Sequence, residues 1–185
     1  MKKLLQLVGF FLLLQATSFN LFYSQAQAQA QAQVKSNPWQ QLQLVGEAEL
    51  KFFFWNVYEA RLYSDSGNFV FLETKPFALE LQYQRQFSSQ QLVEETRKQW
   101  QAIGIDADSE DNTSRLRILE TMLSDVDKGD VITLYVDTQG SSNFYYNGRL
   151  LGTIADSAFT GQFAAIWLSE KTTRPDFRDN LIRQS

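Results

Sequence analysis

The chain has 185 residues, with 17 Lys and Arg against 21 Asp and Glu, and it contains neither histidine nor cysteine. Without these two residue types it cannot build a Ser-His-Asp triad, a thiol nucleophile or an ordinary zinc site. Its net charge of −4 argues against nucleic acid and anionic lipid headgroups as partners. No glycine motif that would cradle a phosphate is present, so no metal and no cofactor is expected.

The N-terminus has the organisation of a secretory signal peptide. Lys2 and Lys3 precede an apolar run over residues 4–14, which is too short to cross a hydrocarbon core as a helix. A Gln/Ala tract over residues 25–33 then offers overlapping small-x-small cleavage sites. Cleavage is expected after Ala28, Ala30 or Ala32. We therefore predict a signal peptide with its cleavage region over residues 1–32, one domain over residues 33–185, a periplasmic location and no stable membrane anchor after cleavage. An uncleaved anchor is the alternative.

Strand patterns dominate the first part of the predicted domain. Residues 39–45 alternate, Gly46 interrupts them, and residues 49–63 are so dense in β-formers that they predict one long strand. Residues 64–68 are typical of a turn. The clearest alternation covers residues 77–84, where Phe, Leu and Tyr side chains share one face that must be buried.

Helices and strands are mixed in the second part. Ser88 and Gln91 form a capping-box pattern and Gly104 is a stop signal, so a helix is expected between them. The later elements are expected in this order: a helix over residues 113–123, a strand over 131–138, a hairpin turn at 147–148, a helix capped by Asp156 and a short helix over 175–182. This mixture indicates one α+β domain.

Two groups of acidic residues could be functional. Residues 106–111 resemble the start of a calcium loop, but Asp111 stands where such a loop needs Gly and Arg117 where it needs Glu. The second group, which could supply paired carboxylates for acid-base chemistry, is Glu47, Glu49 and Glu59. Charged residues on strands usually form a solvated face. The simplest interpretation of residues 106–111 is a solvated loop. Neither group therefore predicts a metal site or catalysis.

Several short strings, in a fixed order, are similar to those of one known family. They are residues 45–48 (VGEA), 55–63 (WNVYEARLY), 100–104 (WQAIG), 144–148 (FYYNG) and 165–168 (AIWL). Over about residues 39–183 the chain resembles the chalcone isomerase-like superfamily, most closely its bacterial exported branch. The resemblance implies an α+β open-faced β-sandwich, in which a large antiparallel sheet packs against a layer of helices and a ligand cleft lies between the two.

The resemblance also implies which residues line that cleft. Chalcone isomerases use an arginine, a threonine, a tyrosine, an asparagine and a small hydroxyl residue. The matching positions here are Ala48, Phe53, Phe87, Glu94 or Glu95, and Ile166. None keeps the catalytic group, so the charge stabilisation and water-holding hydrogen bonds of the isomerisation are lost. Fatty-acid-binding relatives hold a carboxylate with a tyrosine and an arginine; here Tyr58 could be that tyrosine, although nearby Arg61 would point to the opposite strand face.

Three functions follow from these observations. The first is a non-catalytic exported protein that binds an apolar small molecule such as a fatty acid. The second is a periplasmic accessory or interaction protein without a small ligand, and the third is an isomerase or lyase of altered mechanism. An apolar cavity of at least ~300 Å³ would favour the binder. An exposed aromatic patch would favour the interaction protein, and converging charged groups would favour the enzyme.

Overall fold

The computed structural model describes residues 37–183. Its elements in chain order are η1 (Pro38–Gln41), β1 (Gln43–Phe52), β2 (Trp55–Ser64), β3 (Phe77–Tyr83), α2 (Ser89–Ala102), α3 (Glu110–Met122), β4 (Val131–Val136), β5 (Ser142–Tyr146), β6 (Arg149–Ile154), α4 (Ser157–Leu168) and α5 (Pro175–Ile182). The predicted signal peptide and its cleavage sites lie outside the described residues. Within residues 37–183, no helix has the length and apolar character needed to cross a membrane.

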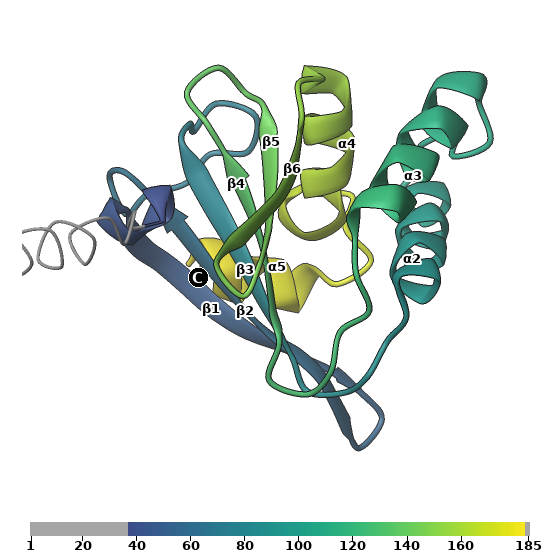
Figure 1. Cartoon of the computed structure of the whole chain (residues 1–185). Helices are drawn as coiled ribbons and strands as arrows, with labels where there is room; N and C mark the ends of the chain where they lie inside the picture. The colour runs from purple at the N-terminus through teal and green to yellow at the C-terminus, as the bar shows by residue number, and fades with distance from the viewer. Residues whose placement is uncertain (1–36, 184–185) are drawn as a thin grey trace, which may run out of the picture. The chain divides into compact units, whose positions relative to one another are not determined.

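Six antiparallel strands pair in chain order, from β1 to β6, in one sheet (Figure 1). The register places Leu62, Leu79 and Leu134 opposite one another on β2, β3 and β4, and Phe144 follows on β5. All four side chains are buried. Since side chains alternate along a strand, this row marks the apolar face that the helices cover. The predicted α+β fold with an antiparallel sheet and a helical layer is confirmed.

The opposite face of the sheet is largely polar. Arg61 lies between Glu47 and Glu59, at 3.7 Å from a carboxylate oxygen of each. Over β3 and β5 on the same face, Trp39 packs edge-on against Tyr145, with ring centroids 4.6 Å apart, and its Nε1 donates a hydrogen bond to Glu80. The three carboxylates considered for acid-base chemistry, Glu47, Glu49 and Glu59, are therefore ion-paired on a solvated face.

The first two strands differ from the sequence-based prediction. Residues 38–41 form a 3₁₀ turn, so the strand predicted from residue 39 begins only at Gln43. Gly46 lies within β1, where a side chain would clash with the backbone carbonyls of Asn180 and Leu181 in α5. The predicted long strand over residues 49–63 is wrong: it is folded into a hairpin whose turn is Phe53 and Phe54. Neither residue is a typical turn former, which is why the pattern hid the turn.

The helices agree closely with the sequence signals. Ser88 and Gln91 form the predicted capping box of α2, and the Asp156 carboxylate accepts hydrogen bonds from the amides of Ala158 and Phe159 at the start of α4. Trp100 of α2 is fully buried and donates from Nε1 to the backbone oxygen of Gln162 in α4. This contact ties α2 to α4, so the helical layer can hold a cavity open against the sheet.

Candidate functional site

A cavity of about 1220 Å³ lies between the apolar face of the sheet and helices α2, α4 and α5. Most of its wall is apolar and comes from elements far apart in the sequence. Its main apolar lining residues are Leu50, Leu79, Leu81, Phe87, Leu92, Val93, Leu123, Ile132, Leu134, Phe144, Phe163, Ile166, Trp167 and Phe177. The volume exceeds the usual range for sites that hold drug-sized ligands, so the cavity could accommodate a long apolar molecule.

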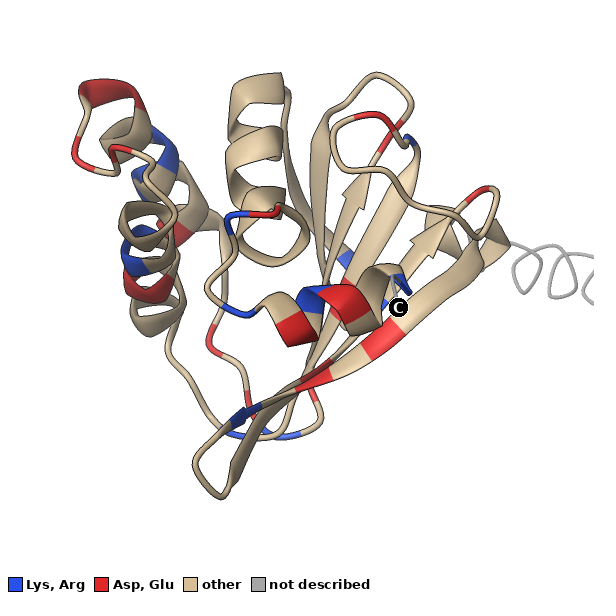
Figure 2. Cartoon of the chain, turned by 180° about the vertical axis from the view of Figure 1, so that it is seen from behind, with Lys and Arg blue, Asp and Glu red and all other residues tan. Residues whose placement is uncertain are grey.

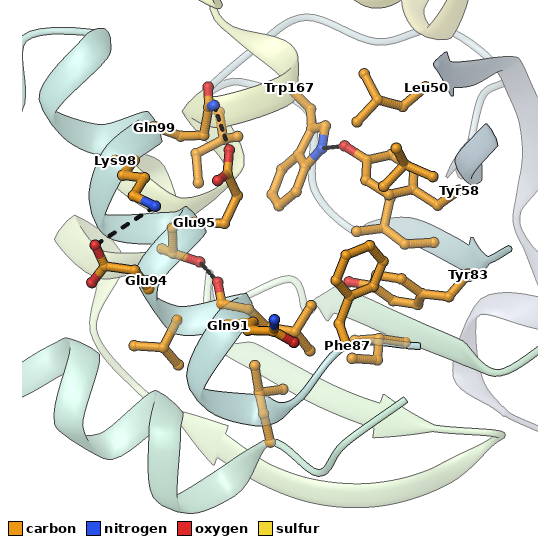
Figure 3. A pocket seen from close by; sticks show the side chains of 18 of the residues that line it. Leu50, Tyr58, Tyr83, Phe87, Gln91, Glu94, Glu95, Lys98, Gln99 and Trp167 are labelled. Atoms are coloured by element: carbon orange, nitrogen blue, oxygen red, sulfur yellow. Dashed lines mark hydrogen bonds and ion pairs between the residues drawn. The ribbon is translucent and has the colours of Figure 1, made fainter. Parts of the chain in front are cut away.

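Two tyrosines bring hydroxyl groups into this apolar space (Figure 3). The Tyr58 hydroxyl of β2 accepts a hydrogen bond of 2.8 Å from Nε1 of Trp167 in α4. Tyr83 of β3 stands beside it, with ring centroids 5.8 Å apart. Within residues 37–183, the Tyr58 hydroxyl makes only this hydrogen bond, in which it accepts, and the Tyr83 hydroxyl makes no side-chain hydrogen bond. Both groups are therefore available as hydrogen-bond donors to a ligand.

Burial fixes the protonation state of these tyrosines. It raises the pKa of Tyr58 far above its ordinary value, and the hydrogen bond from Trp167 offsets only part of this effect. Burial likewise raises the pKa of Tyr83, and the neighbouring Tyr58 adds to the increase. Both phenols are neutral wherever the protein is folded near neutral pH. They can donate hydrogen bonds, but they cannot act as general bases.

Charged and amide side chains surround the apolar space. Along α2, Glu95 accepts a hydrogen bond of 2.8 Å from Gln99, and Lys98 lies 3.9 Å from Glu94 (Figure 3). Arg174, just before α5, also lines the cavity, and within the described part of the chain no carboxylate lies within ion-pair distance of it. Its charge acts to lower the pKa of Tyr58, whereas that of Glu95 acts to raise it. The lining therefore includes four cations, Arg85, Arg97, Lys98 and Arg174, besides the two phenols and the apolar side chains. Arg97 and Lys98 are paired with carboxylates.

The structure brings together most of the residues that the resemblance implied. The cavity-lining members of that set are Tyr58, Phe87, Glu94, Glu95 and Ile166. Ala48 is buried on β1, opposite Ala60 of β2, and is not part of the wall. Phe53 is the exposed turn residue of the first hairpin and also lies outside the cavity. Arg61 points away from Tyr58, on the ion-paired face, as strand alternation required.

Sequence reasoning did not single out Tyr83, Trp167 or Arg174. Tyr83 could have been found, because strand alternation placed it on the buried face, where a tyrosine hydroxyl usually needs a hydrogen-bond partner. Trp167 meets Tyr58 across 109 residues of sequence, and no local pattern predicts such a contact. Arg174 is one of several surface cations and carries no local signal of its own.

The acidic stretch has a structural role. The Asp106 carboxylate accepts a hydrogen bond from the Asp108 amide, and the side-chain amide of Asn112 donates to the Asp106 backbone oxygen at 2.8 Å. Ser109 then caps α3 by accepting from the amide of Asn112. Across residues 37–183 no group of acidic side chains is arranged to hold a metal ion. These contacts shape the loop and begin the helix.

Comparisons with known proteins agree with this architecture. A family model described as chalcone isomerase-like matches residues 23–182. Among solved structures, the crystal structure of an Arabidopsis thaliana fatty-acid binding protein superposes with a TM-score of 0.57 at 11% sequence identity. The match covers 77% of this chain and 87% of the plant chain. No curated protein sequence matches. At this identity the structural likeness establishes the shared fold alone.

Proposed function

The chain belongs to the chalcone isomerase-like family, and we propose that it is a non-catalytic member which binds a long apolar molecule with one polar end, such as a fatty acid. The observation that carries the proposal is the apolar cavity of about 1220 Å³ with two tyrosine hydroxyls inside it. The tail would lie against the apolar wall, where burial from water supplies most of the affinity. Tyr58, Tyr83 and Arg174 would receive the polar end.

The fatty-acid binding protein from Arabidopsis supports this choice of ligand class by analogy, because it shares the fold. A direct test is displacement of a fluorescent fatty acid from the purified protein by unlabelled fatty acids of increasing chain length. Saturable displacement that strengthens with chain length supports the proposal. A fluorescent probe that shows no saturable binding would refute it.

We predict that the protein does not accelerate the closure of chalcone to flavanone. The positions that matched the catalytic arginine and threonine, Ala48 and Phe53, lie outside the cavity and could not polarise a substrate there in any case. The two phenols are held neutral and so cannot act as bases. The wall carboxylates Glu94 and Glu95 are engaged by Lys98 and Gln99. The measurement is the absorbance of chalcone over time at neutral pH, with and without the protein. A rate that rises in proportion to protein concentration would instead favour an isomerase of altered mechanism.

We further propose that the protein acts in the periplasm and belongs to the family's exported branch. The proposal rests on the charged, apolar and cleavable segments of its first 32 residues. Expressed in a Gram-negative host, it should appear in the periplasmic fraction with its N-terminus at Gln29, Gln31 or Gln33, as read by N-terminal sequencing. An intact Met1 in the membrane fraction would show that the segment is an anchor.

A further inference from the structure

The tip of the β1–β2 hairpin is a cluster of four consecutive aromatic residues, Phe52, Phe53, Phe54 and Trp55. These residues are 57%, 81%, 98% and 60% exposed, respectively. The hairpin projects beyond the rest of the sheet, and no charged residue lies at its very end (Figures 1 and 2). Single exposed apolar residues are ordinary on protein surfaces, but a contiguous aromatic patch usually marks a contact site.

The tip is also held in a conformation that its residues do not favour. Phe53 has a φ of +53°, a region that bulky side chains rarely occupy and that Gly, Asn or Asp would occupy more easily in a two-residue turn. The strand pairing nevertheless continues to the last pair, Phe52 with Trp55. A turn with polar residues would be more soluble and less strained. This choice of residues therefore points to a function of the tip itself.

We propose that this aromatic tip inserts into the interfacial layer of a lipid bilayer. Aromatic side chains concentrate at the boundary between headgroups and hydrocarbon, where amphipathic tryptophan is especially favoured. Because β1 and β2 pair up to the turn, few backbone N–H and C=O groups of the tip would lose water without a hydrogen-bond partner on shallow insertion. Arg85 places its guanidinium 4.6 Å from the centre of the Trp55 ring, from where it can remain at the headgroup level.

The charges around the tip favour neutral lipids over anionic ones. Lys51 is already paired with Glu49 at 2.6 Å, and Glu47 and Glu59 lie further along the same two strands. The contact is therefore driven by apolar burial and should be insensitive to salt. A second copy of the chain is a poorer occupant. Four such side chains expose roughly 600 Å² at most, below the ~800 Å² that each partner of a stable dimer buries.

The tip is continuous with the lining of the cavity. Phe52 and Trp55 line both, whereas Phe53 and Phe54 lie only on the tip. A bilayer that received the tip would thus contact residues that border the apolar chamber, and we infer that a lipid enters the chamber at this point. This loading route rests on the proposed function. The membrane contact itself rests on the exposure and geometry of the tip.

The test is flotation of the purified protein, with its N-terminus verified, on phosphatidylcholine vesicles at 0.1 and 0.5 M NaCl, between which the Debye length falls from about 10 Å to roughly 4 Å. The wild type should float with the vesicles at both salt concentrations. The variant Phe53→Ser/Phe54→Ser should lose at least about tenfold in partitioning, since two large apolar side chains no longer insert. Val70→Ser/Leu72→Ser, which removes two exposed apolar side chains elsewhere, should partition like the wild type.

Two outcomes would overturn the inference: a tip variant that floats as well as the wild type, or a tip-dependent dimer in sedimentation experiments without vesicle binding. Because Phe53 and Phe54 do not line the cavity, the tip variant should displace fluorescent fatty acid in solution like the wild type. Failure of the membrane contact and failure of ligand binding are therefore separable.

Discussion

Replacing Leu92 with tryptophan is expected to abolish most ligand binding while leaving the fold intact. Leu92 lies on α2, is half-buried and lines the cavity. An indole at this position would extend into empty space, so the domain need not repack to accept it, whereas a ligand tail would lose its room. The affinity for the fluorescent fatty acid should fall by at least about tenfold, or ~1.4 kcal/mol. The melting temperature should change by only a few degrees.

The matched control for Leu92→Trp is Ile118→Trp. Ile118 is an exposed residue of α3 that does not line the cavity, so this variant adds an indole to a helix without filling the chamber. Its fatty-acid affinity should equal that of the wild type. If Leu92→Trp melted far lower and the wild type bound no fatty acid, the region would be an ordinary packed core, and the proposed function would be wrong.

Asp156→Ala is expected to destabilise the domain by about 2 kcal/mol, the upper range for loss of an N-terminal cap. The Asp156 carboxylate accepts from two amides at the start of α4 and pairs with Arg115 at 2.7 Å. Its loss would leave the mostly buried guanidinium of Arg115 with only neutral partners on Asn112 and Gln162. Since α4 carries Phe163, Ile166 and Trp167, this cap also holds one wall of the cavity. Urea unfolding measures the effect.

Asp156→Asn separates the two contributions. Asparagine caps a helix about as well as aspartate, so this variant should keep most of the cap and lose only the charge. Burial raises the pKa of Asp156, but hydrogen bonds from the Phe159 amide and Arg115 outweigh it and leave the pKa below its ordinary value. The charge therefore stabilises the fold above about pH 4 and ceases to do so as the pH falls through the lower folded-state pKa. The difference in unfolding free energy between wild type and Asp156→Asn should shrink in acid; a constant difference would contradict this account.

Local signals predicted much of the fold. The caps at Ser88 and Asp156 act through hydrogen bonds to residues two or three positions away, so the sequence contains the whole interaction. The alternation of residues 77–84 likewise follows from strand geometry alone. The first hairpin was missed because a run of aromatic β-formers has no residue that interrupts the pattern, and Phe53 adopts a conformation that its type disfavours.

The site was predictable only in part. The resemblance located Tyr58, Phe87 and Ile166 on the cavity wall, because the family's fold places those positions there. The volume of the cavity depends on the distance at which α2, α4 and α5 pack from the sheet. It could not be predicted because no local sequence pattern determines this distance. Two of the three features that were expected to discriminate between functions are present: a large apolar cavity and an exposed aromatic patch. The proposed membrane contact of the aromatic tip is therefore compatible with the proposed binding of an apolar ligand.

Native mass spectrometry of the protein purified without detergent is the most direct test of lipid binding, because it reports the contents of the cavity without a chosen probe. We expect a population of the wild type that is heavier than the bare chain by the mass of one lipid, and we expect Leu92→Trp, prepared in parallel, to carry only the bare mass. Addition of excess fatty acid to delipidated wild type should restore a one-to-one complex. A wild type that shows only the bare mass, both as purified and after the addition of fatty acid, would show that the cavity does not bind fatty acids.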